Sequence, residues 1–136
     1  MSSDLQRIML VEDEPDIQLV ARLALERLGH FTIEICSSGQ EALTRLERFA
    51  PELMLLDVMM PGLDGPATLA ALRRLPAGAA LPVIFMTAKV QPHEIAAYMA
   101  LGAIGTIAKP FDPITLPAEI RALWAQRPGA AGGGRD

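Results

Sequence analysis

The sequence has little of several features that mark particular classes of protein. Its single cysteine, Cys36, cannot form an internal disulfide, which fits a reducing compartment. No apolar run is long enough to span a bilayer, and the first residues lack the basic and apolar segments of a secretory signal. Its 12 basic residues form no cluster and are outnumbered by 16 acidic ones, so nothing favours direct nucleic-acid binding. We therefore expect a cytoplasmic protein that contacts neither membranes nor nucleic acids.

The length and composition predict one globular domain. At 136 residues with 51% hydrophobic content, the chain is large enough to bury a core without disulfides or metal. Patterns of strands and helices continue to residue 127. Residues 128–136 are rich in Gly and Ala without apolar periodicity, so we expect a domain over residues 1–127 and a flexible tail after it.

Five short apolar segments alternate with helical patterns along the chain. Residues 7–11 and 53–57 are continuous apolar runs, as in strands that are buried on both faces, whereas residues 32–36 alternate as in a strand near a sheet edge. Two later segments, 82–86 and 105–108, complete the set. This order predicts an α/β fold of the flavodoxin-like kind, a doubly wound five-stranded parallel sheet with strand order 2-1-3-4-5.

Caps and apolar spacing predict a helix after each strand. Pro15 begins the first helix, and Gly29 is expected to end it. Ser38 and Glu41 form a capping box at the start of the second. Pro66 can occupy the first turn of the third.

The last two helices are predicted in less detail. The fourth begins near Pro92, and its expected apolar residues are Ile95, Met99 and Leu101. Thr115 is the expected cap of a final helix over about residues 116–126.

Polar residues follow four of the predicted strands. In chain order they are Glu12 with Asp13, Asp57, Thr87 and Lys109. The carboxyl ends of parallel strands meet at one edge of the sheet, so these residues should lie together. Neighbouring carboxylates repel one another and favour a divalent cation with oxygen ligands, for which Mg²⁺ is best suited. We expect direct ligation by Asp13 and Asp57 and by a loop carbonyl such as that of Met59. Glu12 would bind through water.

This group of residues can carry phosphoryl chemistry. An aspartate such as Asp57 can act as a nucleophile and carry an aspartyl-phosphate. The metal and Lys109 would neutralise the transferring oxygens, and Thr87 would bind the phosphoryl group after transfer. Each residue alone has a commoner explanation as a turn former, a cap or a surface lysine, and it is their coincidence that favours chemistry.

Four motifs resemble those of the receiver domains of two-component response regulators. They are Val11-Glu12-Asp13-Glu14, the stretch from Leu56 to Gly65, Met86-Thr87-Ala88 and Ala108-Lys109-Pro110-Phe111. The resemblance implies a stand-alone phosphoacceptor in a phosphorelay rather than an enzyme. Asp57 would take phosphate from a histidine kinase or histidine phosphotransfer protein. Glu12 and Asp13 would bind Mg²⁺, while Thr87 and Lys109 would read the phosphorylated state.

The resemblance also implies a cis peptide between Lys109 and Pro110 and one departure from the family. Three residues before the lysine the family commonly has an aromatic that moves with the threonine, and here that residue is Thr106. We expect coupling to run instead through the main chain of residues 87–90 or through Ile104 and Phe111. The output face, made by the fourth helix, fifth strand and last helix, would bind a downstream protein or a second copy of the chain.

Three alternatives are less well supported. A phosphatase of the haloacid dehalogenase type needs an acid two residues after its aspartate, where this chain has Met59. A nucleotide-binding enzyme needs a Gly-rich loop after the first strand, and none is present. A binding module without phosphorylation does not require the intact set of polar residues.

Overall fold

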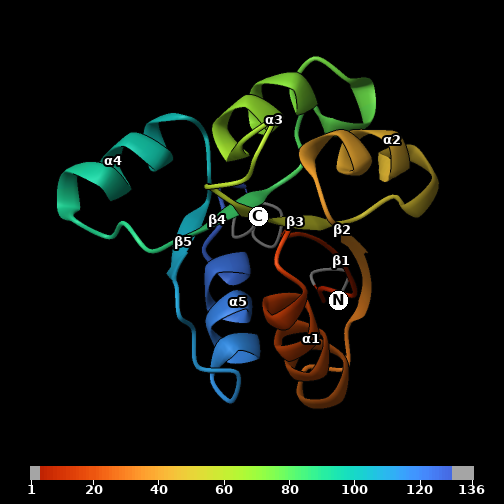
Figure 1. Cartoon of the computed structure of the whole chain (residues 1–136), viewed down its shortest axis with the longest axis vertical. Coiled ribbons are helices and arrows are strands. Elements are labelled where there is room, and N and C mark those ends of the chain that lie inside the picture. The colour runs from red at the N-terminus through yellow and green to blue at the C-terminus, as the bar shows by residue number, and fades with distance from the viewer. Residues whose placement is uncertain (1–3, 130–136) are drawn as a thin grey trace.

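In the computed structural model, which describes residues 4–129, five parallel strands form one sheet in the order β2-β1-β3-β4-β5 (Figure 1). The strands are β1 (Arg7–Val11), β2 (Thr32–Cys36), β3 (Leu53–Asp57), β4 (Val83–Thr87) and β5 (Gly105–Ala108). The predicted fold class and strand order are confirmed. The domain limit at residue 127 stays a prediction, and residues 130–136 of the expected tail lie outside the described residues.

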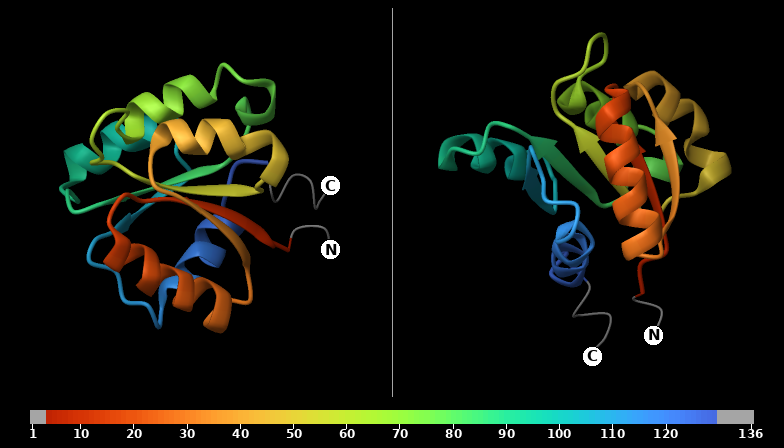
Figure 2. Two further views of the ribbon diagram at one scale, coloured as in Figure 1. Left: turned by 45° about the vertical axis from the view of Figure 1, so that its right-hand side comes forward. Right: turned by 60° about the horizontal axis from the view of Figure 1, so that its bottom comes forward.

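Helices cover both faces of the sheet. They are α1 (Pro15–Leu23), α2 (Gly39–Phe49), α3 (Gly65–Leu72), α4 (Pro92–Ala100) and α5 (Leu116–Ala125). Figures 1 and 2 show α1 and α5 on one face and α2, α3 and α4 on the other. Among residues 4–129 no helix is long and apolar enough to cross a membrane.

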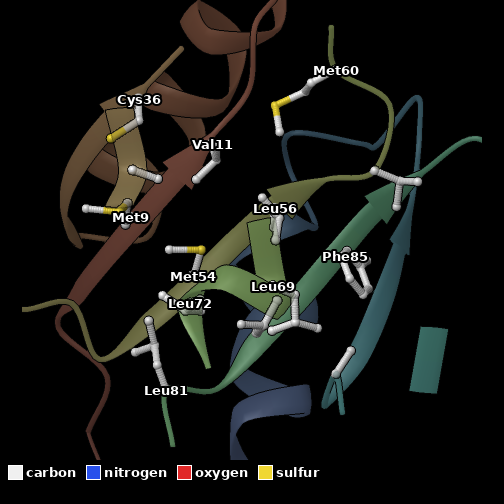
Figure 3. Close-up of a cluster of buried hydrophobic side chains, with 14 of the residues drawn as sticks. Met9, Val11, Cys36, Met54, Leu56, Met60, Leu69, Leu72, Leu81 and Phe85 are labelled. Atoms are coloured by element: carbon white, nitrogen blue, oxygen red, sulfur yellow. The ribbon is translucent and has the colours of Figure 1, made fainter. Parts of the chain in front are cut away.

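Each face of the sheet buries its own apolar cluster. Under α2, α3 and α4, Met54, Leu56 and Phe85 pack together (Figure 3), whereas Leu55 and Ile84 belong to the cluster under α1 and α5. Successive strand residues point to opposite faces, so a strand covered on both sides must be apolar throughout. Burial of each such side chain stabilises the fold by roughly 1.5–3 kcal/mol.

The first helix ends just before Gly29, as predicted, but without the left-handed conformation that is common for glycine there. The helix continues through a π-helical segment, Ala24–Leu28, and Gly29 follows it in a right-handed conformation with φ −90°. His30 takes the left-handed conformation instead, with φ 60°. A Cβ at Gly29 would lie 2.7 Å from the ring of Phe31, so this position needs glycine for close packing rather than for its backbone freedom.

Helix α4 corrects a second expectation. Met99 and Leu101 were expected to be apolar contacts of this helix, but they are 42% and 49% exposed. Ile95 is half-buried, and the buried residue of α4 is Tyr98. The apolar spacing identified the helix correctly, but a spacing does not reveal how much of an apolar stripe reaches the sheet.

The caps are partly as predicted. The Ser38 hydroxyl accepts from the Glu41 N–H at 3.0 Å, which confirms the cap of α2. Helix α5 begins after Thr115 as expected, but the Thr115 side chain makes no cap. Its hydroxyl donates to the Asp112 carbonyl at 3.4 Å, while the Asp112 carboxylate accepts from the Ile114 N–H at 2.9 Å.

Candidate functional site

The strand ends that carry polar residues meet at the carboxyl edge of the sheet. The register places Asp57 beside Met86 and Thr87 beside Ala108, one residue before Lys109. Glu12 directly follows β1, whose last residue, Val11, pairs with Leu56. The short apolar strands stop at the same level, so the side chains that follow them gather at one place.

Lys109 links two carboxylates that come from different strands. Its Nζ donates to Glu12 Oε1 at 3.1 Å and to Asp57 Oδ1 at 3.1 Å. Glu12 is 0% exposed and Asp57 3%, so both charges are removed from water. Burial alone would lower the pKa of Lys109, but the hydrogen bonds and charges of Glu12 and Asp57 outweigh it and the pKa rises. The ammonium therefore stays charged at neutral pH.

Glu12 is the most deeply buried charge of the site. Burial raises its pKa above the ordinary value, and repulsion from Asp57 adds to the shift. The backbone N–H of Glu14 donates to Glu12 Oε2 at 3.1 Å, and this bond and Lys109 act in the opposite direction. The site thus holds a carboxylate that would gain from a further positive charge.

Three carboxylates form an acidic cluster that suits a metal ion. Oxygen atoms of Glu12, Asp13 and Asp57 lie within 4.8 Å of one another. A set of donors made only of oxygen, with charge to neutralise, matches a hard divalent cation such as Mg²⁺. The backbone carbonyl of Met59 stays a predicted ligand.

Thr87 is buried at the end of β4, and its hydroxyl already has two contacts. Its Oγ1 accepts from the Lys89 N–H at 2.9 Å and lies 3.4 Å from the hydroxyl of Tyr98. The sequence reasoning missed Tyr98. A signal was present, because Tyr98 lies three residues after Ile95 and so on the same helix face.

Two backbone features complete the site. The Lys109-Pro110 peptide is cis, as predicted. A Cβ at Gly65 would lie 2.6 Å from the Asp57 carbonyl oxygen, so the first turn of α3 packs directly on the backbone of Asp57. The sequence reasoning had Gly65 within a motif but gave no reason for glycine there.

A groove lies beside the site on the α1 side. It encloses about 440 Å³ and is lined by Asp16, Ile17 and Val20 of α1 and by Lys109, Pro110 and Phe111. Apart from Asp16 and Lys109 its lining is apolar, so a partner could bury apolar surface there while reaching the acidic pocket.

Comparisons with known proteins agree on one family. The profile described as "Response regulator receiver domain" matches residues 8–121. The transcriptional regulatory protein CseB of Streptomyces coelicolor is 36% identical over 132 residues, 97% of this chain and 54% of CseB. An uncharacterised 14.6 kDa protein of Leptolyngbya boryana is 36% identical over 109 residues, 80% of this chain and 82% of that protein.

Solved structures give the same picture. The chemotaxis protein CheY4 of Vibrio cholerae has a TM-score of 0.80 at 25% identity, covering 88% of this chain and 99% of CheY4. A response regulator of Desulfuromonas acetoxidans has a TM-score of 0.78 at 30% identity and covers 89% of this chain and 98% of its own. The chain spans about half the length of several curated relatives that it matches, CseB among them.

Proposed function

The chain belongs to the response regulator receiver domain family, and we propose that Asp57 is its phosphoacceptor. Family membership makes it a signalling phosphoacceptor rather than a conventional enzyme and implies a histidine kinase as partner. One observation supports Asp57 above all. Its carboxylate is buried at the end of a central strand, yet it is held by Lys109 at 3.1 Å and lies within the acidic cluster.

The transfer step needs one nucleophile and one leaving group. An oxygen of the Asp57 carboxylate forms a bond to phosphorus while the bond from phosphorus to the donor's histidine nitrogen breaks. The electron pair of that bond stays on the imidazole nitrogen, which takes a proton from solvent. The product is an acyl phosphate on Asp57 and a neutral histidine on the donor.

Each neighbouring residue has a role that follows from its chemistry. Lys109 donates to a phosphoryl oxygen and keeps contact with Glu12, and the Thr87 hydroxyl donates to another phosphoryl oxygen. Asp13 and Asp57 would hold Mg²⁺ directly, together with the Met59 carbonyl and with Glu12 through water. When bound, the ion supplies positive charge to the phosphoryl oxygens.

The groove beside Lys109 gives the phosphodonor a place to bind. Its lining by Ile17, Val20 and Phe111 suits an apolar surface on a histidine kinase or histidine phosphotransfer protein. Phosphorylation then changes a second surface, made by α4, β5 and α5, which binds a downstream protein or a second copy. The exposed Met99 on α4 and Leu101 just after it supply apolar contact area for that interaction.

A phosphatase of the dehalogenase type is disfavoured by the residue at position 59. Such an enzyme needs a general acid two residues after its aspartate. Met59 has no titratable group and its side chain points to solvent. An acyl phosphate on Asp57 is therefore left without an assigned acid, as suits a protein that stores a signal.

The test is labelling by a small phosphodonor. Acetyl phosphate with Mg²⁺ should add one phosphoryl group to the protein, seen by intact mass. Asp57→Asn should remain unlabelled. Asp64→Asn is the matched control, because Asp64 is an exposed cap of α3 whose acceptor role asparagine can keep. Labelling that persists in Asp57→Asn, or that is undiminished by excess chelator, would contradict the proposal.

A further inference from the structure

We propose that Tyr98, from helix α4, is the residue that couples Thr87 to the output face. The inference rests on the proposed function, since Thr87 must meet a phosphoryl group for the coupling to operate. It assigns to α4 a role that the family commonly gives to an aromatic of β5. In this chain that position is Thr106.

The contact that carries the inference joins two buried hydroxyls. Thr87 Oγ1 and the Tyr98 hydroxyl are 3.4 Å apart, at the upper end of the range for a hydrogen bond. Both residues are buried, so neither hydroxyl can readily replace this contact with water. The position of one therefore depends on the position of the other.

The ring of Tyr98 packs on the same face of the sheet that the short Thr106 of β5 faces. It packs on Phe85 with ring centroids 5.4 Å apart and an angle of 51° between the rings. Phe85 pairs with Thr106 in the sheet, so both side chains point to the same face. A large aromatic at position 106 would compete with Tyr98 for that face.

Ile104 and Phe111, the residues expected to carry the coupling, pack in the cluster on the opposite face.

The contact between Thr87 and Tyr98 is sensitive to phosphorylation because the Thr87 hydroxyl has only one proton to donate. A threonine hydroxyl has one proton, and Thr87 Oγ1 already accepts from the Lys89 N–H at 2.9 Å. A phosphoryl oxygen only accepts, so binding it uses the one proton that Thr87 has. Tyr98 can then keep its contact only as a donor. If Tyr98 accepts from Thr87 in the unphosphorylated protein, its hydrogen bond must reverse or break.

A change at Tyr98 reaches the surface because α4 has little else to hold it. Tyr98 is the buried residue of this helix, and Met99 and Leu101 beside it are exposed. Displacing the one buried side chain of α4 shifts the neighbours that a partner would contact. Phosphorylation thereby favours one position of α4 through a contact that differs between the two states.

The chain offers a direct probe, because Tyr98 is its only tyrosine. Protein grown with 3-fluorotyrosine should show one ¹⁹F resonance from this site. Beryllofluoride with Mg²⁺ serves as the phosphoryl mimic, and its own bound ¹⁹F signal reports occupancy. We expect the Tyr98 resonance to shift in parallel with that occupancy. An unmoved Tyr98 resonance at full occupancy would overturn the inference and leave the proposed function intact.

A variant separates coupling from packing. Tyr98→Phe keeps the ring on Phe85 but removes the hydroxyl, so the fold should be retained. Amide NMR of this variant with beryllofluoride should keep the shifts next to Asp57 and lose most of the shifts over residues 92–100. Ala96→Ser, an exposed change on the same helix, should respond as the natural protein does.

Two outcomes count against the inference. Shifts over residues 92–100 that are as large in Tyr98→Phe as in the natural protein would show that the hydroxyl contact carries no coupling. Absence of any bound beryllofluoride in the natural protein would overturn the proposed function and this inference with it.

Discussion

Lys109 is the residue on which the charge balance of the site depends. One ammonium contacts two carboxylates that are almost fully buried. Removing one partner of a buried ion pair lowers the stability of the fold by more than the pair itself contributed. The remaining charge is then buried without a charge to balance it. The residue has a matched control, since Lys89 is the only other lysine in the chain and is exposed.

Lys109→Met should therefore lower the stability of the metal-free protein by about 3 kcal/mol. Urea denaturation measures the change. Lys89→Met should cost less than about 0.5 kcal/mol, because exposed lysines contribute little. Added Mg²⁺ should reduce the loss of stability in Lys109→Met, since the ion supplies positive charge at the same carboxylates. Equal urea midpoints for the two variants would contradict this account.

We expect Met59 to affect how long the phosphorylated aspartate persists. Hydrolysis of the acyl phosphate needs a water in line with the phosphorus, and Met59 has no group to hold one. Met59→Asn should shorten the lifetime of the phosphorylated protein several-fold, as followed by loss of the label after the donor is removed. Met99→Asn, which changes an exposed methionine far along the chain, should decay at the natural rate. A variant at position 59 that decays no faster would refute the role.

Cys36 gives a pH dependence with a defined sign. Burial raises the pKa of its thiol to about 12, from an ordinary 9.0. Below pH 9 the thiol is protonated in both the folded and the unfolded state, so the thiol does not reduce the stability. As the pH rises towards 12 only the unfolded chain loses the proton, so stability falls by about 1.4 kcal/mol per pH unit. Cys36→Ala should lack this part of the slope in urea titrations, and equal slopes would contradict the shift.

At the scale of elements, the first turn of α3 fixes the backbone of Asp57. Gly65→Ala would place a Cβ 2.6 Å from the Asp57 carbonyl oxygen, and a backbone atom cannot move aside as a flexible side chain can. Gly62 is the comparison, because a Cβ there meets nothing within 4 Å and only its φ of 74° opposes alanine.

Gly65→Ala should destabilise the protein by about 1–3 kcal/mol and also slow its labelling by acetyl phosphate. Gly62→Ala should cost about 1 kcal/mol from the left-handed backbone alone and leave the labelling rate unchanged. Chemical denaturation and intact mass measure the two effects. Natural labelling in Gly65→Ala would show that the close contact does not position Asp57.

Helix and strand boundaries that depend on residues adjacent in the chain were predictable from the sequence. The strand that ends at Asp57 is one, because an apolar run stops there, and the cap of α2 by Ser38 is another. The packing of helix α4 on the sheet could not be predicted in this way. Its contact with the sheet through Tyr98 depends on how the helix sits over Phe85, and nothing local determines that. Thr115 failed as a cap because its hydroxyl donates to the Asp112 carbonyl, and Pro117 in the first turn has no N–H to offer it.

At the scale of the whole molecule, the topology explains why the site could be predicted. Once the chain is read as alternating strands and helices, the parallel sheet brings Asp13, Asp57, Thr87 and Lys109 to one edge without any further information. The contact of Thr87 with Tyr98 could not be predicted in this way. It joins a strand end to the middle of a helix, and only three-dimensional packing brings the two together.

The acidic cluster should also link metal binding to global stability. A ligand that binds only the folded state stabilises it by about 2.7 kcal/mol at 100 times its dissociation constant. Mg²⁺ should accordingly raise the thermal midpoint in a concentration-dependent manner. Asp13→Asn should weaken the response, because it removes charge from the cluster. A midpoint that does not change with Mg²⁺ would contradict the metal site.

The bond between Lys109 and Glu12 joins residues 97 positions apart in the chain. During synthesis the chain leaves the ribosome from its N-terminus, so both acidic strand ends emerge well before the lysine that balances them. A partly made protein can thus assemble β1 and β3 but has no ammonium between their carboxylates. The set of contacts among Glu12, Asp57 and Lys109 is completed only when β5 takes its place.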